Sequence, residues 1–130
     1  MSAAANEHQV GGEHYGGGSM QHWDWCVENQ LGYLEGQITK YISRWRRKNG
    51  RQDLEKALHY ADKLYEVKES HGWHTHFQLH RVEVRGLARM VELYGLSAQE
   101  ELVFTLAASY RDLTDINVMR GAIRNLLKGV

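Results

Sequence analysis

Three basic residues recur every four positions in the middle of the chain, at Lys40, Arg44 and Lys48. On an α-helix this spacing places their side chains on one face. Ammonium and guanidinium groups gathered on one face suit an anion, and a phosphate is the anion that we expect. Asn49-Gly50 follows directly and predicts a tight turn, so a second helix can fold back beside the basic face.

The segment after the turn carries a mixed set of polar residues at helical spacing. Asp53, Lys56 and Tyr60 share one predicted face. The carboxylate of Asp53 could orient a basic side chain or accept a hydrogen bond from a sugar or base. Tyr41 and Trp45 alternate with the bases of the first helix, and their rings could stack on a nucleobase. A solvated charged face is the alternative, but the combination favours an anion site.

The apolar spacing around these residues predicts an all-α fold, a small bundle of about six helices. The chain has 13 glycines and no proline, which is consistent with uninterrupted helices. Residues 1–20 are rich in glycine and have no apolar period, so we expect a flexible arm there and a single helical domain over 21–130. Thr114 or Asp115 is expected to cap the last helix, and Ser97 with Glu100 matches a capping box. The expected helices are 21–29, 34–48 and 52–70, with 34–70 as a helical hairpin. Within 75–128 we expect a helix over 75–94, one that follows the capping box and includes the apolar run 102–110, and a last one through 127.

In the first of these helices we expect Trp23 and Val27 to face inward. The only cysteine, Cys26, excludes a disulfide within the chain, favours a reducing cytoplasm and is expected to pack as a small buried hydrophobe. No apolar run is as long as a membrane span, and no signal peptide is evident, so we expect no membrane partner. The 16 basic and 16 acidic side chains balance, which argues against a nucleic-acid coat protein and makes a nucleic-acid partner unexpected.

Two other clusters could hold a metal ion, and both are weaker than the basic face. Asp62, Glu66 and Glu69 share a helix face. The run Glu66-Val67-Lys68-Glu69 matches one of the two carboxylate elements with which all-α nucleotide pyrophosphohydrolases bind magnesium, but no second element faces it. The second cluster consists of four histidines within ten residues, His71, His74, His76 and His80. Because both clusters are weaker candidates than the basic face, we expect no protein-bound metal.

No Walker A motif occurs in the chain, so any phosphoryl chemistry would have to use another design.

The run from Val10 to Glu66 resembles a small domain that is widespread in bacteriophage genomes and is usually labelled nucleotide kinase or domain of unknown function. The shared pattern begins with His-Tyr and continues with Gly-x-x-x-Lys-Tyr-x-x-Arg, Lys-x-Gly and Asp-Leu-x-Lys-Ala-x-x-Tyr. The matching residues are His14-Tyr15, Gly36, Lys40, Tyr41, Arg44, Lys48, Gly50, Asp53, Leu54, Lys56, Ala57 and Tyr60.

The resemblance implies a phage protein that acts on nucleotides in the cytoplasm of the infected bacterium. Its implied activity is that of a (deoxy)nucleoside monophosphate kinase without a P-loop, using a nucleoside triphosphate as phosphate donor, with or without Mg²⁺. His14, as the group able to shuttle a proton near neutrality, and the phosphate-holding Lys40 and Arg44 become the expected catalytic residues. The expected nucleotide-binding residues are Tyr15, Tyr41, Lys48, Asp53 and Lys56, with Tyr15 or Tyr41 stacking on the base.

Two other functions remain open at this point. A non-catalytic nucleotide binder, which sequesters or regulates a host signalling nucleotide, would need the same basic pocket. A nucleic-acid or protein interaction module would instead use Arg46, Arg47 and Arg51 on phosphates. Because amphipathic helices rich in tyrosine and tryptophan seldom bury every ring in so short a chain, we also expect a homo-oligomer.

Overall fold

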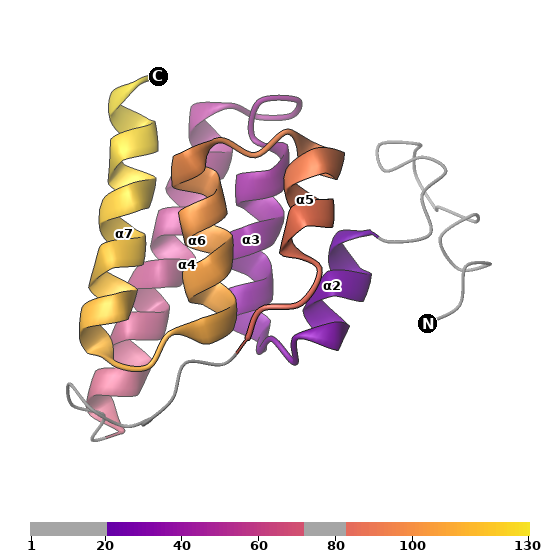
Figure 1. The fold of residues 1–130 in the computed structure, drawn as a ribbon. Helices are drawn as coiled ribbons and strands as arrows, with labels where there is room; N and C mark the ends of the chain where they lie inside the picture. The colour runs from indigo at the N-terminus through magenta and orange to yellow at the C-terminus, as the bar shows by residue number, and fades with distance from the viewer. Residues whose placement is uncertain (1–20, 72–82) are drawn as a thin grey trace.

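The structure is a computed structural model that describes residues 21–71 and 83–130. Within these residues the chain is all-α, as predicted, with six helices and no strand (Figure 1). The helices are α2 (His22–Glu28), α3 (Tyr33–Arg44), α4 (Arg51–Ser70), α5 (Leu87–Tyr94), α6 (Ala98–Ser109) and α7 (Leu113–Lys128). The predicted arm 1–20, with His14 and Tyr15, lies outside the described residues, as do His74, His76 and His80.

Four of the helices form a bundle in which each helix packs against two others. α3 contacts α4 and α6, and α7 contacts the same two helices from the other side. α2 packs against α3, and α5 packs against α6, at one edge of the bundle (Figure 1). The backbone N–H of His22 donates to the hydroxyl of Tyr94 at 3.1 Å, which joins α2 to α5. The α3–α4 hairpin predicted from residues 34–70 is therefore one side of the bundle.

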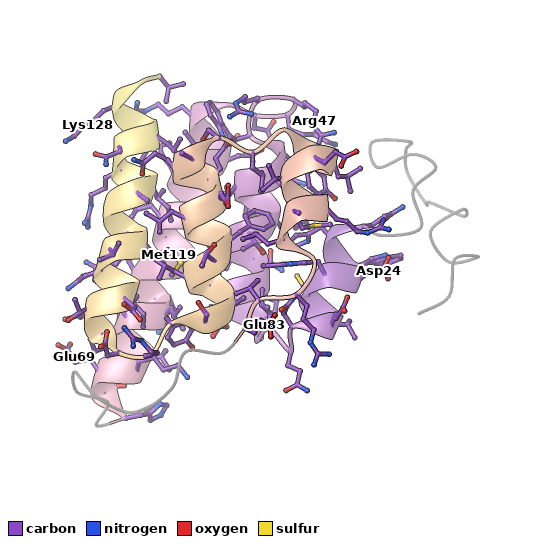
Figure 2. All side chains as sticks on the ribbon, viewed as in Figure 1. Asp24, Arg47, Glu69, Glu83, Met119 and Lys128 are labelled. Atoms are coloured by element: carbon purple, nitrogen blue, oxygen red, sulfur yellow. The ribbon has the colours of Figure 1, made fainter. Side chains whose placement is uncertain are left out.

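The long helices bury the faces that their apolar spacing predicts. On α4, Leu54, Ala57, Ala61 and Leu64 are all buried. Met119 of α7 also has no exposed surface and points into the bundle (Figure 2). Burial of these side chains supplies the main force that holds the bundle together.

The predicted inward face of α2 is wrong. Trp23 and Val27 are 50% and 63% exposed, whereas Trp25 is fully buried. The ring of Trp25 packs against Phe104 of α6, with centroids 4.9 Å apart. A helix of two turns has too few residues for the spacing of its apolar side chains to define its buried face. In α2, the buried face is instead determined by the contact between Trp25 and Phe104. Cys26, the neighbouring residue, is only partly buried.

Three helix boundaries differ from the predictions. α3 ends at Arg44, four residues before the predicted Lys48, and residues 45–50 form turns that end at Gly50, whose φ of 57° is in the region that glycine favours. The expected helix 75–94 does not include residues 83–86, which are not helical, and α5 begins only after the left-handed Gly86. Residues 75–82 lie outside the described residues. Asp112, not Thr114 or Asp115, caps α7 by accepting the backbone N–H of Asp115 at 2.8 Å.

Ser97 and Glu100 form the predicted capping box at the start of α6. Glu100 also has a role that the box does not reveal. Its side chain is only 1% exposed and accepts hydrogen bonds from the indole of Trp45 and the guanidinium of Arg46, in the turns after α3. The carboxylate therefore ties the end of α3 to the beginning of α6.

Candidate functional site

The α3–α4 hairpin brings three basic side chains around the ring of Tyr41. The guanidinium carbon of Arg44 lies 4.7 Å from the ring centroid, and the Nζ atoms of Lys56 and Lys40 lie 5.3 and 5.8 Å from it. Lys40, Tyr41 and Arg44 come from α3 and Lys56 from α4, and all four are partly exposed. These four residues are called the Tyr41 cluster below. Cation–π contacts hold the like charges beside one another, each contributing about 0.5–1 kcal/mol at exposed positions.

Asp53 is the carboxylate of this cluster, and it is completely buried. Its Oδ2 atom lies 3.4 Å from Nε of Arg44. The same carboxylate accepts the backbone N–H of Asn49 and its side-chain amide, both at 3.3 Å. Asp53 thus stabilises the turn between the helices and pairs with the guanidinium of Arg44, which is partly exposed.

The rings around Tyr41 form a connected aromatic group. Tyr60 of α4 stacks on Tyr41 with a centroid distance of 5.9 Å and an interplanar angle of 10°. Tyr33 and His59 each meet the ring of Tyr60 at a steep angle, at 6.3 and 6.2 Å. Because Tyr41 already contacts Tyr60 and the guanidinium of Arg44, a nucleobase could stack on it only if a neighbour moved.

The arginines of the turn have partners away from the Tyr41 cluster. Lys48 lies exposed in the turns after α3 and has an interaction partner of its own. Arg46 binds Glu100, and Arg47 lies over the ring of Tyr94 at 5.5 Å. Arg51 donates to the carbonyls of residues 127 and 130 and pairs with Glu55 at 3.5 Å. The three arginines of the expected nucleic-acid face therefore have partners within the chain.

A second polar group, which the sequence interpretation missed, lies beside Lys40. Nε2 of His22 is 2.7 Å from the hydroxyl of Thr39 and 3.4 Å from the sulfur of Cys26. Burial, and to a lesser extent the charge of Lys40, lowers the pKa of His22 from 6.5 to about 4. Burial also raises the pKa of the Cys26 thiol to about 11, against the opposing effect of a hydrogen bond with Thr39. The pair is therefore a neutral imidazole and a protonated thiol, unlike an activated thiolate. The i, i+4 spacing of His22 and Cys26 was the signal for it.

The buried imidazole makes the stability of the fold depend on pH. Its pKa is lower in the folded chain than in the unfolded chain, so between about pH 6.5 and pH 4 the unfolded state binds more protons. We expect the free energy of unfolding to fall through this window as pH drops, by up to about 3 kcal/mol from this group. Urea unfolding at several pH values measures the slope. A His22→Gln variant should have a shallower slope in the same window, and an unchanged slope would contradict the assignment.

Two of the three carboxylates of the alternative magnesium face, Asp62 and Glu66, have basic partners. Oδ1 of Asp62 lies 3.0 Å from Nε of Arg120 and 3.9 Å from Nη2 of Arg124, so it joins α4 to α7. Glu66 pairs with Lys63 at 3.6 Å. In residues 21–71 and 83–130, no three His, Cys, Asp or Glu side chains are grouped closely enough to hold a metal ion. No helix in the same residues is long and apolar enough to cross a membrane.

Comparison with known proteins assigns part of the chain to a family. Residues 11–62 match the model of DUF3310, a protein family of unknown function. No curated protein and no solved structure matches the chain. The matched segment contains α2, α3, the turn and α4 as far as Asp62. The chain therefore carries a DUF3310 domain of unknown function at residues 11–62, and this domain contains every residue of the Tyr41 cluster.

Proposed function

We propose that the Tyr41 cluster binds the phosphate groups of a nucleotide, and that the protein is a (deoxy)nucleoside monophosphate kinase without a P-loop. The observation that carries the proposal is the convergence of Lys40, Arg44 and Lys56 on one ring, from two helices. Asp53 provides one negative charge against these three positive charges. Such an excess of positive charge on a partly exposed seam attracts a multiply charged anion.

The geometry of Arg44 supports a phosphate ligand. Asp53 contacts the guanidinium at Nε, and no ion pair or hydrogen bond within the described residues involves the two terminal nitrogens. These nitrogens form the fork that binds two oxygens of a phosphate in parallel. An ion pair with a buried carboxylate restricts the guanidinium and so reduces the entropy lost when the ligand binds.

The same cluster suits phosphoryl transfer, which depends mainly on positioning and on neutralising charge. In the proposed reaction the terminal P–O bond of a nucleoside triphosphate breaks. A new bond forms from that phosphorus to a phosphate oxygen of a nucleoside monophosphate, which gives two nucleoside diphosphates. Lys40 and Lys56 would neutralise the transferred group, and Arg44 would orient it. The proposed proton shuttle, His14, and the aromatic Tyr15 belong to the part of the chain outside the described residues.

The alternative of a non-catalytic nucleotide binder needs the same cations. A phosphate oxygen of a nucleoside monophosphate is already ionised near neutral pH, so its attack requires no carboxylate as a base. The burial of Asp53 against Arg44 and Asn49 is therefore compatible with both functions. A protein that only sequesters a nucleotide would keep the cations and omit the transfer step.

Binding and transfer assays on the natural chain separate these functions. We expect nucleoside mono-, di- and triphosphates to bind in calorimetry, and the corresponding nucleoside, which has no phosphate, to bind far more weakly. We also expect labelled phosphate to move from a triphosphate to a deoxynucleoside monophosphate in the presence of Mg²⁺. Binding without transfer would establish the sequestering function instead. Absence of binding to every nucleotide would overturn the proposal, and affinity that rises with oligonucleotide length and falls steeply with salt would support a nucleic-acid module.

A further inference from the structure

Tyr33 is the most exposed of the large hydrophobic side chains that the structure describes, at 70%. It is the first residue of α3, and its ring meets the ring of Tyr60 at 76° with centroids 6.3 Å apart. A hydrogen bond with Tyr60 also raises the pKa of the Tyr33 hydroxyl above its usual value. The ring is therefore open to a ligand and is held in place by its neighbour.

The exposed ring lies on the same helix face as the cations. Tyr33, Lys40 and Arg44 are separated by seven and four residues, which places them in one row along α3. At about 1.5 Å of rise per residue, Lys40 lies about 10 Å and Arg44 about 16 Å along the axis from Tyr33. α4 runs back along α3, so Lys56 lies toward the Arg44 end and Tyr60 toward the Tyr33 end. The α3–α4 seam thus has an aromatic end and a cationic end.

This order matches the order of groups in a nucleoside polyphosphate. We propose that Tyr33, backed by Tyr60, is the base-stacking surface of the site, and that the ligand is a nucleoside di- or triphosphate lying along the seam with its phosphates toward Arg44. The inference rests on the proposed function, because it assumes that the cations bind phosphate. Stacking on an aromatic face is open to every base. The engaged ring of Tyr41 then serves to hold the cations, and the open ring of Tyr33 receives the base.

The length of the seam selects the ligand class. A monophosphate carries its charge close to the sugar, and a base on Tyr33 would leave that single phosphate short of Arg44. Each further phosphate brings negative charge toward Arg44 and Lys56, so we expect affinity to increase from the mono- to the di- and triphosphate of the same nucleoside. If the protein is a kinase, the ligand of this seam would be the triphosphate that donates the phosphate or the diphosphate that is formed.

Two ligands that differ only in the base and sugar test the inference. Tyr33→Ala is expected to weaken binding of a nucleoside triphosphate about tenfold or more, the size found when a stacking ring is removed. The same variant should bind inorganic tripolyphosphate as the natural chain does, because no cation has changed. Tyr33→Trp, which keeps a stacking face, should retain nucleotide affinity. Since Tyr33 is exposed, circular dichroism and thermal unfolding of each variant should match the natural chain.

The possible outcomes distinguish the two proposals. If Tyr33→Ala binds the nucleoside triphosphate normally while Lys40→Ala weakens both ligands, the phosphate site stands and the base surface is wrong. If the natural chain binds neither ligand, the proposed function itself fails. If a single-stranded oligonucleotide displaces the triphosphate with an affinity that rises with strand length, a nucleic acid occupies the seam and the inference is overturned.

Discussion

A variant with both Lys40→Ala and Lys56→Ala is expected to bind a nucleoside diphosphate about a hundredfold more weakly than the natural chain. The change removes two of the three cations that surround Tyr41. A hydrogen bond to a charged group contributes about 1.5–3 kcal/mol, and about 1.4 kcal/mol corresponds to a factor of ten in affinity. Both lysines are partly exposed, so we take the lower end of this range for each.

The two lysines are better test positions than Arg44. No ion pair with a described carboxylate involves Lys40 or Lys56, so their removal strands no buried negative charge. Only cation–π contacts to Tyr41 are lost, and these are individually small. The double variant should therefore unfold at nearly the same urea concentration as the natural chain, and any loss of affinity can be attributed to the site.

Matched variants sharpen this experiment. Lys128→Ala removes an exposed lysine from the last turn of α7 (Figure 2) and should leave affinity unchanged. Lys40→Arg with Lys56→Arg keeps the charge and should retain most of the affinity, with a changed preference among ligands because the guanidinium is a planar fork. Calorimetric titration at low and high salt measures all four proteins. Unchanged affinity in a folded Lys40→Ala, Lys56→Ala variant would exclude the Tyr41 cluster as the phosphate site.

The parts of the fold that could be predicted are those in which local sequence and burial agree. Four apolar residues of α4 at helical spacing are all buried, and the pair Ser97 and Glu100 forms the predicted cap. In a long helix the apolar spacing is repeated over many positions, so it identifies the buried face. α2 has only seven residues, and there the contact of Trp25 with Phe104, which is distant in the sequence, decided which side faces the bundle.

The site illustrates the same limit. Spacing predicted that Lys40 and Arg44 share a face and that a turn brings α4 beside it, since both follow from the helical period and from Asn49-Gly50. It could not predict that Tyr60 stacks on Tyr41, or that Asp53 is buried against Arg44. A period identifies the face of a helix, but the partner across the interface depends on the rotation and offset of the two helices.

Removal of the Asp53 carboxylate is expected to have a large effect on stability. Asp53→Ala should lower the free energy of unfolding by about 3 kcal/mol, the lower limit for breaking a buried ion pair, because Arg44 keeps 17% exposure and can regain some water. The variant also leaves two N–H donors of Asn49 without their acceptor at the turn. Asp53→Asn keeps an acceptor oxygen for Asn49 but not the charge, so we expect a smaller loss.

A double-mutant cycle with Arg44→Ala tests whether the ion pair is the cause. Arg44→Ala alone should also be strongly destabilising, because it leaves the carboxylate of Asp53 buried with only Asn49 as its partner. If the pair acts as a unit, the double variant should lose clearly less than the sum of the two single losses, since no charge is then left buried alone. Urea unfolding gives the three values. Additive losses would mean that Asp53 stabilises the turn independently of Arg44. Its part in fixing the guanidinium toward a phosphate would then have to be abandoned, although the cations around Tyr41 would remain in place.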